Sequence, residues 1–285
     1  MINLKDTFQM GVLGNVAINR DDFKNENSIT NSLSVKSLNG VPNGLVPNYV
    51  PFKESENSFL DKFPLSHSKI QIPTIYDNLQ IEPELVFECD IKYYNNSVLY
   101  IIPKRFTVYN DATLHRLSIN KVSKNKNWGE NSKGIAIKWL DIEKFEEGGT
   151  LSNYNIVSFI KRGGVIEPYT VDTKIENYPY LYDNLIEWTI KQIKEQKNVL
   201  SLDDIDSLIK KAGNPKKFLI NIGTTLYTPI GDRTFLEDKD EVFIVMYDRT
   251  KYRSESIKAY LLAYKTRNVN YDGMVILHQR AYLEN

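Results

Sequence analysis

The segment from Glu84 to Ile91 constrains the fold more than any other, because apolar side chains recur in it at alternate positions. Side chains two residues apart in a β-strand point to the same face of a sheet. One face would carry Leu85, Phe87, Cys89 and Ile91, and the other Glu84, Val86, Glu88 and Asp90. The alternation predicts a β-strand with one apolar face and one more polar face.

Most of the remaining chain also favours strands. Further β-prone segments lie at residues 70–72, 98–102, 106–109, 135–140, 154–160, 217–222, 242–247, 257–264 and 274–277. Residues 161–164 are typical of a hairpin turn between two of these strands. Two other segments predict helices: residues 181–193, and a segment that begins after Ser201 and ends at Gly213. We therefore expect a mixed α/β, β-rich fold.

The N-terminal part of the chain differs in composition from the rest. Residues 19–58 are rich in Asn, Ser, Asp and Lys, and residues 39–51 contain two Asn-Gly turns and three prolines. Such a segment predicts a surface loop, and a loop of this length is either disordered or a functional lid. We expect an N-terminal segment over residues 1–58 with a long loop or lid, and a core domain over residues 59–285.

The charge balance and the cysteine count limit the kinds of partner that the protein is expected to bind and the cell compartment in which it is expected to lie. The 36 basic and 36 acidic residues cancel, whereas nucleic-acid binders usually carry a basic surface. No segment has the roughly 18 apolar residues that a membrane span needs, and residues 1–6 do not resemble a signal peptide. The single cysteine, Cys89, excludes a disulfide within the chain. We expect a cytoplasmic protein without nucleic-acid or membrane partners.

The motif Glu82-Pro83-Glu84 is the most informative local feature for chemistry. In a strand its two carboxylates would lie on one face, about 6–7 Å apart. Burial of two like charges raises the pKa of at least one, and a hard cation such as Mg²⁺ or Mn²⁺ would remove the conflict. A solvated strand face is the competing interpretation. The motif alone favours that interpretation, because Glu88 and Asp90 continue the same face.

An ordered set of motifs resembles the fumarylacetoacetate hydrolase family over roughly residues 60–250. The family's Glu-x-Glu-Leu strand corresponds to residues 82–85. Its Asn-Asp strand corresponds to residues 106–113, where Asp111 follows Glu84 by 27 residues. The later motifs are Ser132-Lys133-Gly134, Trp139-Leu140, the helix at 181–193, the turn at 222–225 and the strand approach at 235–242.

The resemblance implies a fold similar to the fumarylacetoacetase C-terminal β-roll, with a few peripheral helices. It implies Mg²⁺ or Mn²⁺ bound by the counterparts of Glu82, Glu84 and Asp111. The substrate would be a small carboxylate, a 2-oxo acid or an acylpyruvate-like compound. The reaction would be C–C bond hydrolysis, decarboxylation or isomerisation through a metal-bound enolate. The resemblance also implies a homodimer.

The resemblance suggests further site residues. Lys133 would place positive charge near a developing oxyanion, with Lys126 as the rival lysine. The turn residues Gly223, Thr224 and Thr225 would bind the substrate carboxylate.

Candidates for proton transfer are His115 and His67. Many hydrolytic family members carry a His–Glu pair on a lid near the N-terminus, yet no histidine precedes His67 here. Two alternatives to an enzyme therefore stay open: a non-catalytic, metabolite-binding member of the same fold, and an unrelated β-rich structural protein.

Overall fold

A long hairpin, formed by β6 (Pro83–Tyr94) and β7 (Ser97–Asn110), runs through the middle of the larger of two sheets. The computed structural model describes residues 3–18, 40–54, 56, 58–74, 78–115, 120–264 and 271–284. Asn95 and Asn96 close the hairpin with φ angles of 47° and 60°. This left-handed conformation matches the twist of the flanking strands, and asparagine tolerates it better than most residues.

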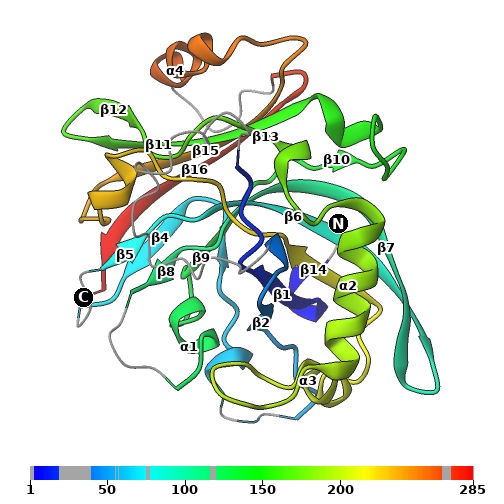
Figure 1. The fold of residues 1–285 in the computed structure, drawn as a ribbon. Helices are drawn as coiled ribbons and strands as arrows, with labels where there is room; N and C mark the ends of the chain where they lie inside the picture. Colours follow the sequence, from blue (N-terminus) through cyan, green and yellow to red (C-terminus); the bar gives the residue numbers. More distant parts are fainter. Residues whose placement is uncertain are drawn as a thin grey trace.

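The larger sheet has eight strands, and it places the N-terminal strands beside a strand from residues 217–221 (Figure 1). Its order is β2 (Gly44–Tyr49), β1 (Phe8–Leu13), β14 (Lys217–Asn221), β6, β7, β9 (Lys133–Ile135) and β3 (Leu65–Ser66), while β10 (Leu140–Asp141) pairs with β7. Strand β1 runs parallel to β14, and β14 runs antiparallel to β6.

The smaller sheet has six strands and lies against the larger one (Figure 1). Its order is β12 (Val165–Pro168), β11 (Tyr154–Arg162), β15 (Glu241–Asp248), β16 (Met274–Leu283) and β4 (Lys69–Ile72), while β13 (Thr173–Lys174) pairs with β11. The predicted turn at 161–164 joins β11 to β12, as expected. A separate pair consists of β5 (Leu79–Gln80) and β8 (Thr113–Leu114).

The main hydrophobic core lies between the two sheets. It contains all four apolar residues of the alternating face of β6, Leu85, Phe87, Cys89 and Ile91, and so confirms the predicted alternation. The smaller sheet contributes side chains such as Ile244 from its central strand β15. Each fully buried aliphatic or aromatic side chain stabilises the fold by about 1.5–3 kcal/mol, so this layer contact dominates the stability.

Four α-helices lie on the periphery of the described structure. They are α1 (Ser123–Lys126), α2 (Tyr182–Glu195), α3 (Ile205–Lys211) and α4 (Ser254–Ala263). Short 3-10 turns lie at Leu4–Asp6, Phe59–Asp61, Thr150–Asn153, Ile175–Asn177 and Gly231–Arg233. Helix α2 packs Leu185 and Ile193 into the main core, as its predicted apolar stripe requires.

The structure corrects the strand predicted at residues 257–264, which belong mostly to helix α4. Ile257 and Leu261 are the buried residues of this helix, and they pack against the outer face of the smaller sheet. Their spacing of four residues fits one face of a helix. The sequence misleads here because β-branched and aromatic residues in this short run also favour strands.

The predicted surface loop at residues 39–51 is wrong for Gly44–Tyr49, which form the fully buried strand β2. Residues 19–39 of the predicted loop or lid lie outside the described residues. The division at residue 58 stays a prediction, although β1 and β2 both belong to the larger sheet. Helix α3 is capped by Asp204, whose carboxylate accepts from the N–H of Ser207 at 2.9 Å, rather than by the predicted Ser201.

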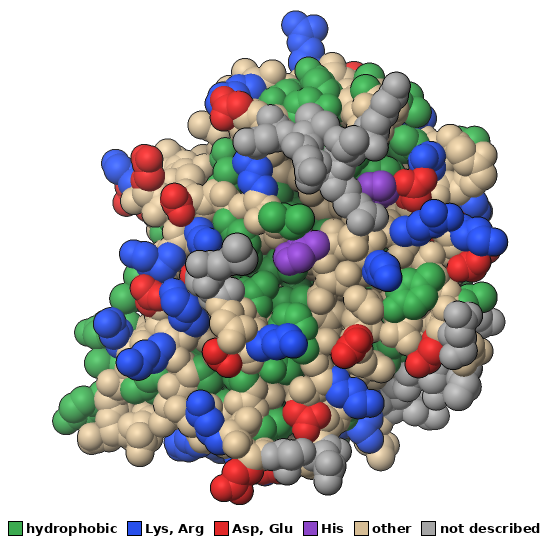
Figure 2. Space-filling view, turned by 180° about the vertical axis from the view of Figure 1, so that it is seen from behind, with side chains coloured by type: hydrophobic (Ala, Val, Ile, Leu, Met, Phe, Trp, Pro, Cys, Tyr) green, Lys and Arg blue, Asp and Glu red, His purple; other side chains and the backbone are tan. Residues whose placement is uncertain are grey.

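The surface carries charges of both signs. Figure 2 shows the face opposite to that in Figure 1, where basic and acidic side chains are interspersed. Within the described ranges, no helix is long and apolar enough to cross a membrane.

A buried amide, Gln279 on β16, connects the smaller sheet to the end of the β6–β7 hairpin. Its Nε2 donates to the carbonyl of Lys69 at 2.7 Å, and its Oε1 accepts from Asn110 at 2.9 Å. The Asn110 side chain in turn accepts from the N–H of Glu82 at 3.3 Å. Gly134 leaves the room for this amide, because a Cβ there would lie 2.2 Å from Oε1 of Gln279.

We expect Gly134→Ala to lower the free energy of unfolding by about 1–3 kcal/mol, because the added methyl group overlaps the buried Gln279 amide. Urea denaturation measures the change. Ile137→Ala is the control, because that side chain is 67% exposed and should change stability by less than about 0.5 kcal/mol. Equal stability of the two variants would show that the amide is not rigidly placed.

Candidate metal and substrate site

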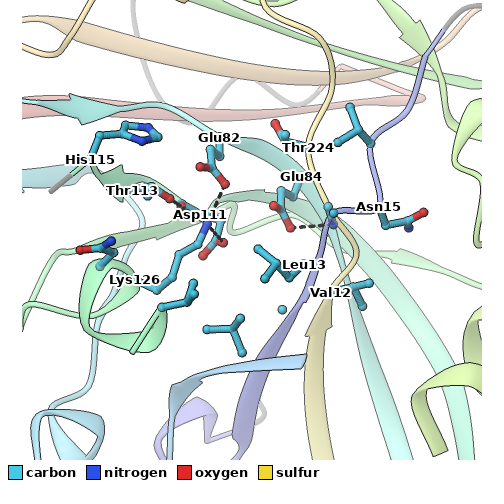
Figure 3. Close-up of a pocket in the computed structure, with 17 residues that line it drawn as sticks. Val12, Leu13, Asn15, Glu82, Glu84, Asp111, Thr113, His115, Lys126 and Thr224 are labelled. Atoms are coloured by element: carbon cyan, nitrogen blue, oxygen red, sulfur yellow. Dashed lines mark hydrogen bonds and ion pairs between the residues drawn. The ribbon is translucent and has the colours of Figure 1, made fainter. Parts of the chain in front are cut away.

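Three carboxylates meet at the end of the β6–β7 hairpin that lies away from its turn. Glu82 precedes β6, Glu84 lies within it, and Asp111 follows β7. The N–H of Asp111 donates to the carbonyl of Glu82 at 2.9 Å and continues the strand pairing. One oxygen of each carboxylate lies within 4.8 Å of the others, and all three residues are buried. The structure thus brings together the three residues predicted to hold a metal (Figure 3).

The Glu84 carboxylate is fixed from strand β14 and the turn that follows it. The side-chain amide of Asn221 donates to Oε2 of Glu84 at 2.7 Å, and the N–H of Gly223 donates to the same oxygen at 2.9 Å. Gly223 has a φ of +105°, and a Cβ there would lie 1.9 Å from the carbonyl oxygen of Asn15. Only glycine therefore fits this turn without moving its neighbours.

Asn15 ties the Gly223 turn to the end of β1. Its Nδ2 donates to the carbonyl of Ile222 at 2.6 Å and to that of Tyr180 at 3.0 Å, and its Oδ1 accepts from the N–H of Tyr180 at 3.0 Å. Gly14, at a φ of 82°, turns the chain just before Asn15. This segment contributes a wall of the site.

Two lysines contact the carboxylates from the opposite side. The Nζ of Lys126 lies 2.7 Å from Oε2 of Glu82 and 2.6 Å from Oδ2 of Asp111. The Nζ of Lys133 lies 3.0 Å from Oδ1 of Asp111 and also donates to the carbonyl of Ala112. Both lysines are buried. Both of the lysines that the sequence analysis offered as alternatives therefore contact the carboxylates, and the catalytic role of either one stays a prediction.

The short helix α1 positions Lys126, and its flanks are fixed by side-chain hydrogen bonds. Ser123 donates to the carboxylate of Asp203 at 2.8 Å. After the helix, the amide of Asn127 donates to the carbonyls of Asn48 at 2.7 Å and Lys62 at 3.1 Å. These contacts hold the backbone on either side of Lys126, while the side chain itself reaches into the site.

The buried charges shift each other's protonation. Burial, followed by the charge of Asp111, raises the pKa of Glu84 to about 8. Burial disfavours the ammonium of Lys126, but Asp111 and Glu82 outweigh it and raise its pKa. Burial lowers the pKa of Lys133 to about 8, against the attraction of Asp111. At neutral pH the site therefore holds Glu84 mainly as the neutral acid and both lysines mainly charged.

A cavity of about 150 Å³ borders the three carboxylates (Figure 3). Its lining residues come from β1 and the following turn, from β2, from the carboxylate cluster, from residues 113–115, from residues 122–126 and from the Gly223 turn. Three buried polar atoms of lining residues have no hydrogen-bond partner: Nε2 of His115, Oδ1 of Asn125 and Oγ1 of Thr224. Unpaired buried polar atoms are rare in folded proteins, so these atoms are suited to bind a polar ligand.

The other predicted site residues are placed in different ways. His115, Gly223 and Thr224 line the cavity, but the N–H of Gly223 is already donated to Glu84. Lys133 and Thr225 are buried and do not line it, and Lys133 lies behind Asp111. His67 is exposed, and its Nδ1 contacts the carbonyl of Ile135 at 2.8 Å. The catalytic and substrate-binding roles of these residues stay predictions.

The sequence comparison missed the amides that surround the cluster. Asn48 donates to Oδ1 of Asp111 at 3.3 Å and to Oδ1 of Asn221 at 3.0 Å, so it joins two of the site's elements. Asn221 is the last residue of β14, directly before the Ile222-Gly223 turn. Its position next to a glycine turn could have identified Asn221 as a site residue from the sequence. Nothing near Asn48 distinguishes that residue from the other asparagines of residues 39–51.

Comparisons with known proteins give a family and a fold. A profile described as "Family of unknown function (DUF5718)" matches residues 30–281. No curated protein sequence is significantly similar to the chain.

Several solved structures are similar over 98% of the chain. They include Cg1458 with an inhibitor, at a TM-score of 0.53, 16% identity and 77% of that chain. The apo form of 2-keto-3-deoxy-D-arabinonate dehydratase has a TM-score of 0.51, 12% identity and 74% coverage. The 5-carboxymethyl-2-hydroxymuconate delta-isomerase from Mycobacterium smegmatis has a TM-score of 0.50, 13% identity and 80% coverage. These similarities confirm the predicted β-rich fold of the fumarylacetoacetate hydrolase type.

The raised pKa of Glu84 predicts a pH-dependent stability in metal-free protein. Its folded pKa of about 8 exceeds the ordinary value of 4.5, so between these values the folded chain binds a proton that the unfolded chain does not. The free energy of unfolding should therefore fall by about 1 kcal/mol per pH unit from about pH 5 to pH 8 through this group.

Glu84→Gln isolates this contribution, because a neutral amide can still accept from Asn221 and Gly223. We expect the variant and the wild type to be similarly stable at about pH 5. The variant should become the more stable of the two by up to a few kcal/mol at about pH 8. Urea denaturation in EDTA measures both. A stability difference that does not change with pH would contradict the raised pKa.

Proposed function

The chain belongs to the DUF5718 family, whose function is unknown, and we propose that it is a metal-dependent enzyme acting on a small 2-oxo acid or acylpyruvate-like compound. The observation that carries this proposal is the buried carboxylate cluster beside a small polar cavity. We further propose that the chain is a divergent relative of the fumarylacetoacetate hydrolase family. The motif order and the shared fold type support this relationship.

The donor set fits a hard divalent cation. Glu82, Glu84 and Asp111 offer carboxylate oxygens, which Mg²⁺ and Mn²⁺ prefer. Asn221 and Gly223 orient the Glu84 carboxylate, and Lys133 and Asn48 orient that of Asp111. When bound, the cation would act as a Lewis acid toward a chelated 2-oxo-carboxylate. Mg²⁺ and Mn²⁺ both suit these ligands.

The cavity fits a small, anionic substrate. A volume of about 150 Å³ is well below the several hundred cubic ångströms of a typical drug-sized pocket. The unpaired hydroxyl of Thr224 can donate to a substrate carboxylate or carbonyl, because a hydroxyl carries one donor. A 2-oxo acid of a few carbon atoms matches both the size and the polarity of the cavity.

His115 is the best-placed group for proton transfer. It lines the cavity, and burial lowers its pKa below the usual 6.5. Its imidazole is therefore neutral at pH 7, so the unpaired Nε2 can serve as a proton acceptor. Lys133, which does not line the cavity, would act indirectly by holding Asp111. Neither the exposed position of His67 nor its contact with Ile135 supports a role in the reaction.

A non-catalytic, metabolite-binding protein of the same fold is the alternative function. The same cavity and unpaired polar atoms would bind a small carboxylate in that case, without turnover. A homodimer and a cytoplasmic location remain predictions from the sequence and the resemblance.

We expect wild-type protein to bind Mn²⁺, and Asp111→Asn to weaken binding at least tenfold because it removes an anionic ligand. Isothermal titration calorimetry measures the affinity. Asp90→Asn is the matched control, since Asp90 lies on β6 but is paired with Lys217 away from the cluster. Equal Mn²⁺ affinity of Asp111→Asn and the control would reject the metal site.

We expect the Mn²⁺-loaded protein to turn over at least one compound of a panel that contains oxaloacetate and several acylpyruvates. His115→Gln should lower kcat by about 10²–10⁴-fold if His115 is the general base. The wild-type kcat/KM should decrease with acidification only below pH 6.5, because the pKa of His115 is lowered. Binding of these compounds without turnover would favour the non-catalytic alternative.

A further inference from the structure

We propose that Lys126 is a built-in cation that occupies the carboxylate cluster in the metal-free protein and must leave when a divalent cation binds. The inference rests on the proposed metal site. Its basis is that the Nζ of Lys126 contacts two of the three candidate ligand residues directly, Glu82 at 2.7 Å and Asp111 at 2.6 Å. The ammonium therefore binds oxygens of two of the three carboxylates that would hold the metal.

The two cations would compete for these carboxylates. A cation bonded to Oε2 of Glu82 and Oδ2 of Asp111 at about 2.1 Å would lie within about 4 Å of the Lys126 ammonium. The shared carboxylate oxygens would then lie between two positive charges whose repulsion is weakly screened in a buried site, so each cation would weaken the binding of the other. Either the metal or the ammonium occupies this position.

Lys133 does not compete in the same way. It contacts the other oxygen of Asp111, Oδ1, at 3.0 Å, and it also donates to the carbonyl of Ala112. Its ammonium also lies over the ring of Trp128, 5.4 Å from the centroid. Lys133 can therefore keep its contacts while a metal binds Oδ2 of Asp111.

The cavity offers space for the displaced side chain of Lys126. Its side chain lines the cavity, whereas the flanking backbone is held by the contacts of Ser123 and Asn127. The proposed displacement would require the side chain alone to move along the cavity wall, with helix α1 held in place. The displaced ammonium would then face the cavity that receives the substrate carboxylate, so metal binding would prepare the site for an anion.

The first experiment compares Mn²⁺ affinity by isothermal titration calorimetry in wild type, Lys126→Met and Lys124→Met. Methionine keeps the length of the side chain and removes the charge. Lys124 lies on the same helix but is exposed, so it is a matched control. We expect Lys126→Met to bind Mn²⁺ at least tenfold more tightly than wild type, and Lys124→Met to bind like wild type. Lys126→Gln serves as a second variant if the methionine variant does not fold.

The outcomes separate this inference from the metal site itself. Equal or weaker Mn²⁺ binding by the Lys126 variants than by wild type would overturn the competition and leave the metal site standing. No binding by any of the proteins would overturn both proposals. Binding by the Lys126 variants alone would support the inference and reject a metal dependence of the native chain.

A second measurement needs no variant. Wild-type protein is reductively methylated with formaldehyde and a borane, with and without saturating Mn²⁺, and each lysine is followed by peptide mass spectrometry. Lys126 should react slowly without Mn²⁺, because it is 5% exposed, and at least severalfold faster with Mn²⁺. Lys133, fully buried, should stay slow in both states. Unchanged protection of Lys126 in Mn²⁺-saturated protein would overturn the inference.

Discussion

The structure depends on the neutralisation of three carboxylates that the fold buries at one end of the β6–β7 hairpin. The backbone hydrogen bond between Glu82 and Asp111 places the two residues side by side. An uncompensated buried carboxylate costs several kcal/mol, which is comparable with the whole stability of a domain. Cations and hydrogen-bond donors from other parts of the chain therefore have to contact these carboxylates. The order of the strands and helices places such groups around the cluster.

The compensating groups come from distant parts of the sequence. Asn48 lies on β2, Lys126 on α1, Lys133 on β9 and Asn221 on β14. The parallel pairing of β1 with β14 places the Asn15 turn against Gly223 and closes this side of the site. A site assembled in this way requires the complete sheet, which explains why the N-terminal strands are built into its edge.

The alternation around Phe87 sufficed to predict a strand at residues 84–91, because strand periodicity is a local signal. The carboxylate cluster was implied by the resemblance of the ordered motifs to the fumarylacetoacetate hydrolase family, whereas the Glu82-Pro83-Glu84 motif alone favoured a solvated strand face. Strand β2 could not be recognised, since its Asn, Gly and Pro residues signal turns and only tertiary pairing with β1 makes it a strand. Helix α4 was misread because tertiary packing, not local preference, decides between strand and helix in a short apolar run.

The charges of the cluster can be balanced in both of its proposed states, the metal-free state and the metal-bound state. Without a metal, the negative charges of Glu82 and Asp111 are matched by the two lysines, and the raised pKa of Glu84 keeps that residue neutral at pH 7. With a divalent cation in place of Lys126, three ionised carboxylates would be matched by the metal and Lys133. The cluster itself would be neutral in both states if Glu84 released its proton on metal binding, and the displaced Lys126 ammonium would add one positive charge to the cavity wall. A buried site with this property can bind a metal reversibly without a large electrostatic cost.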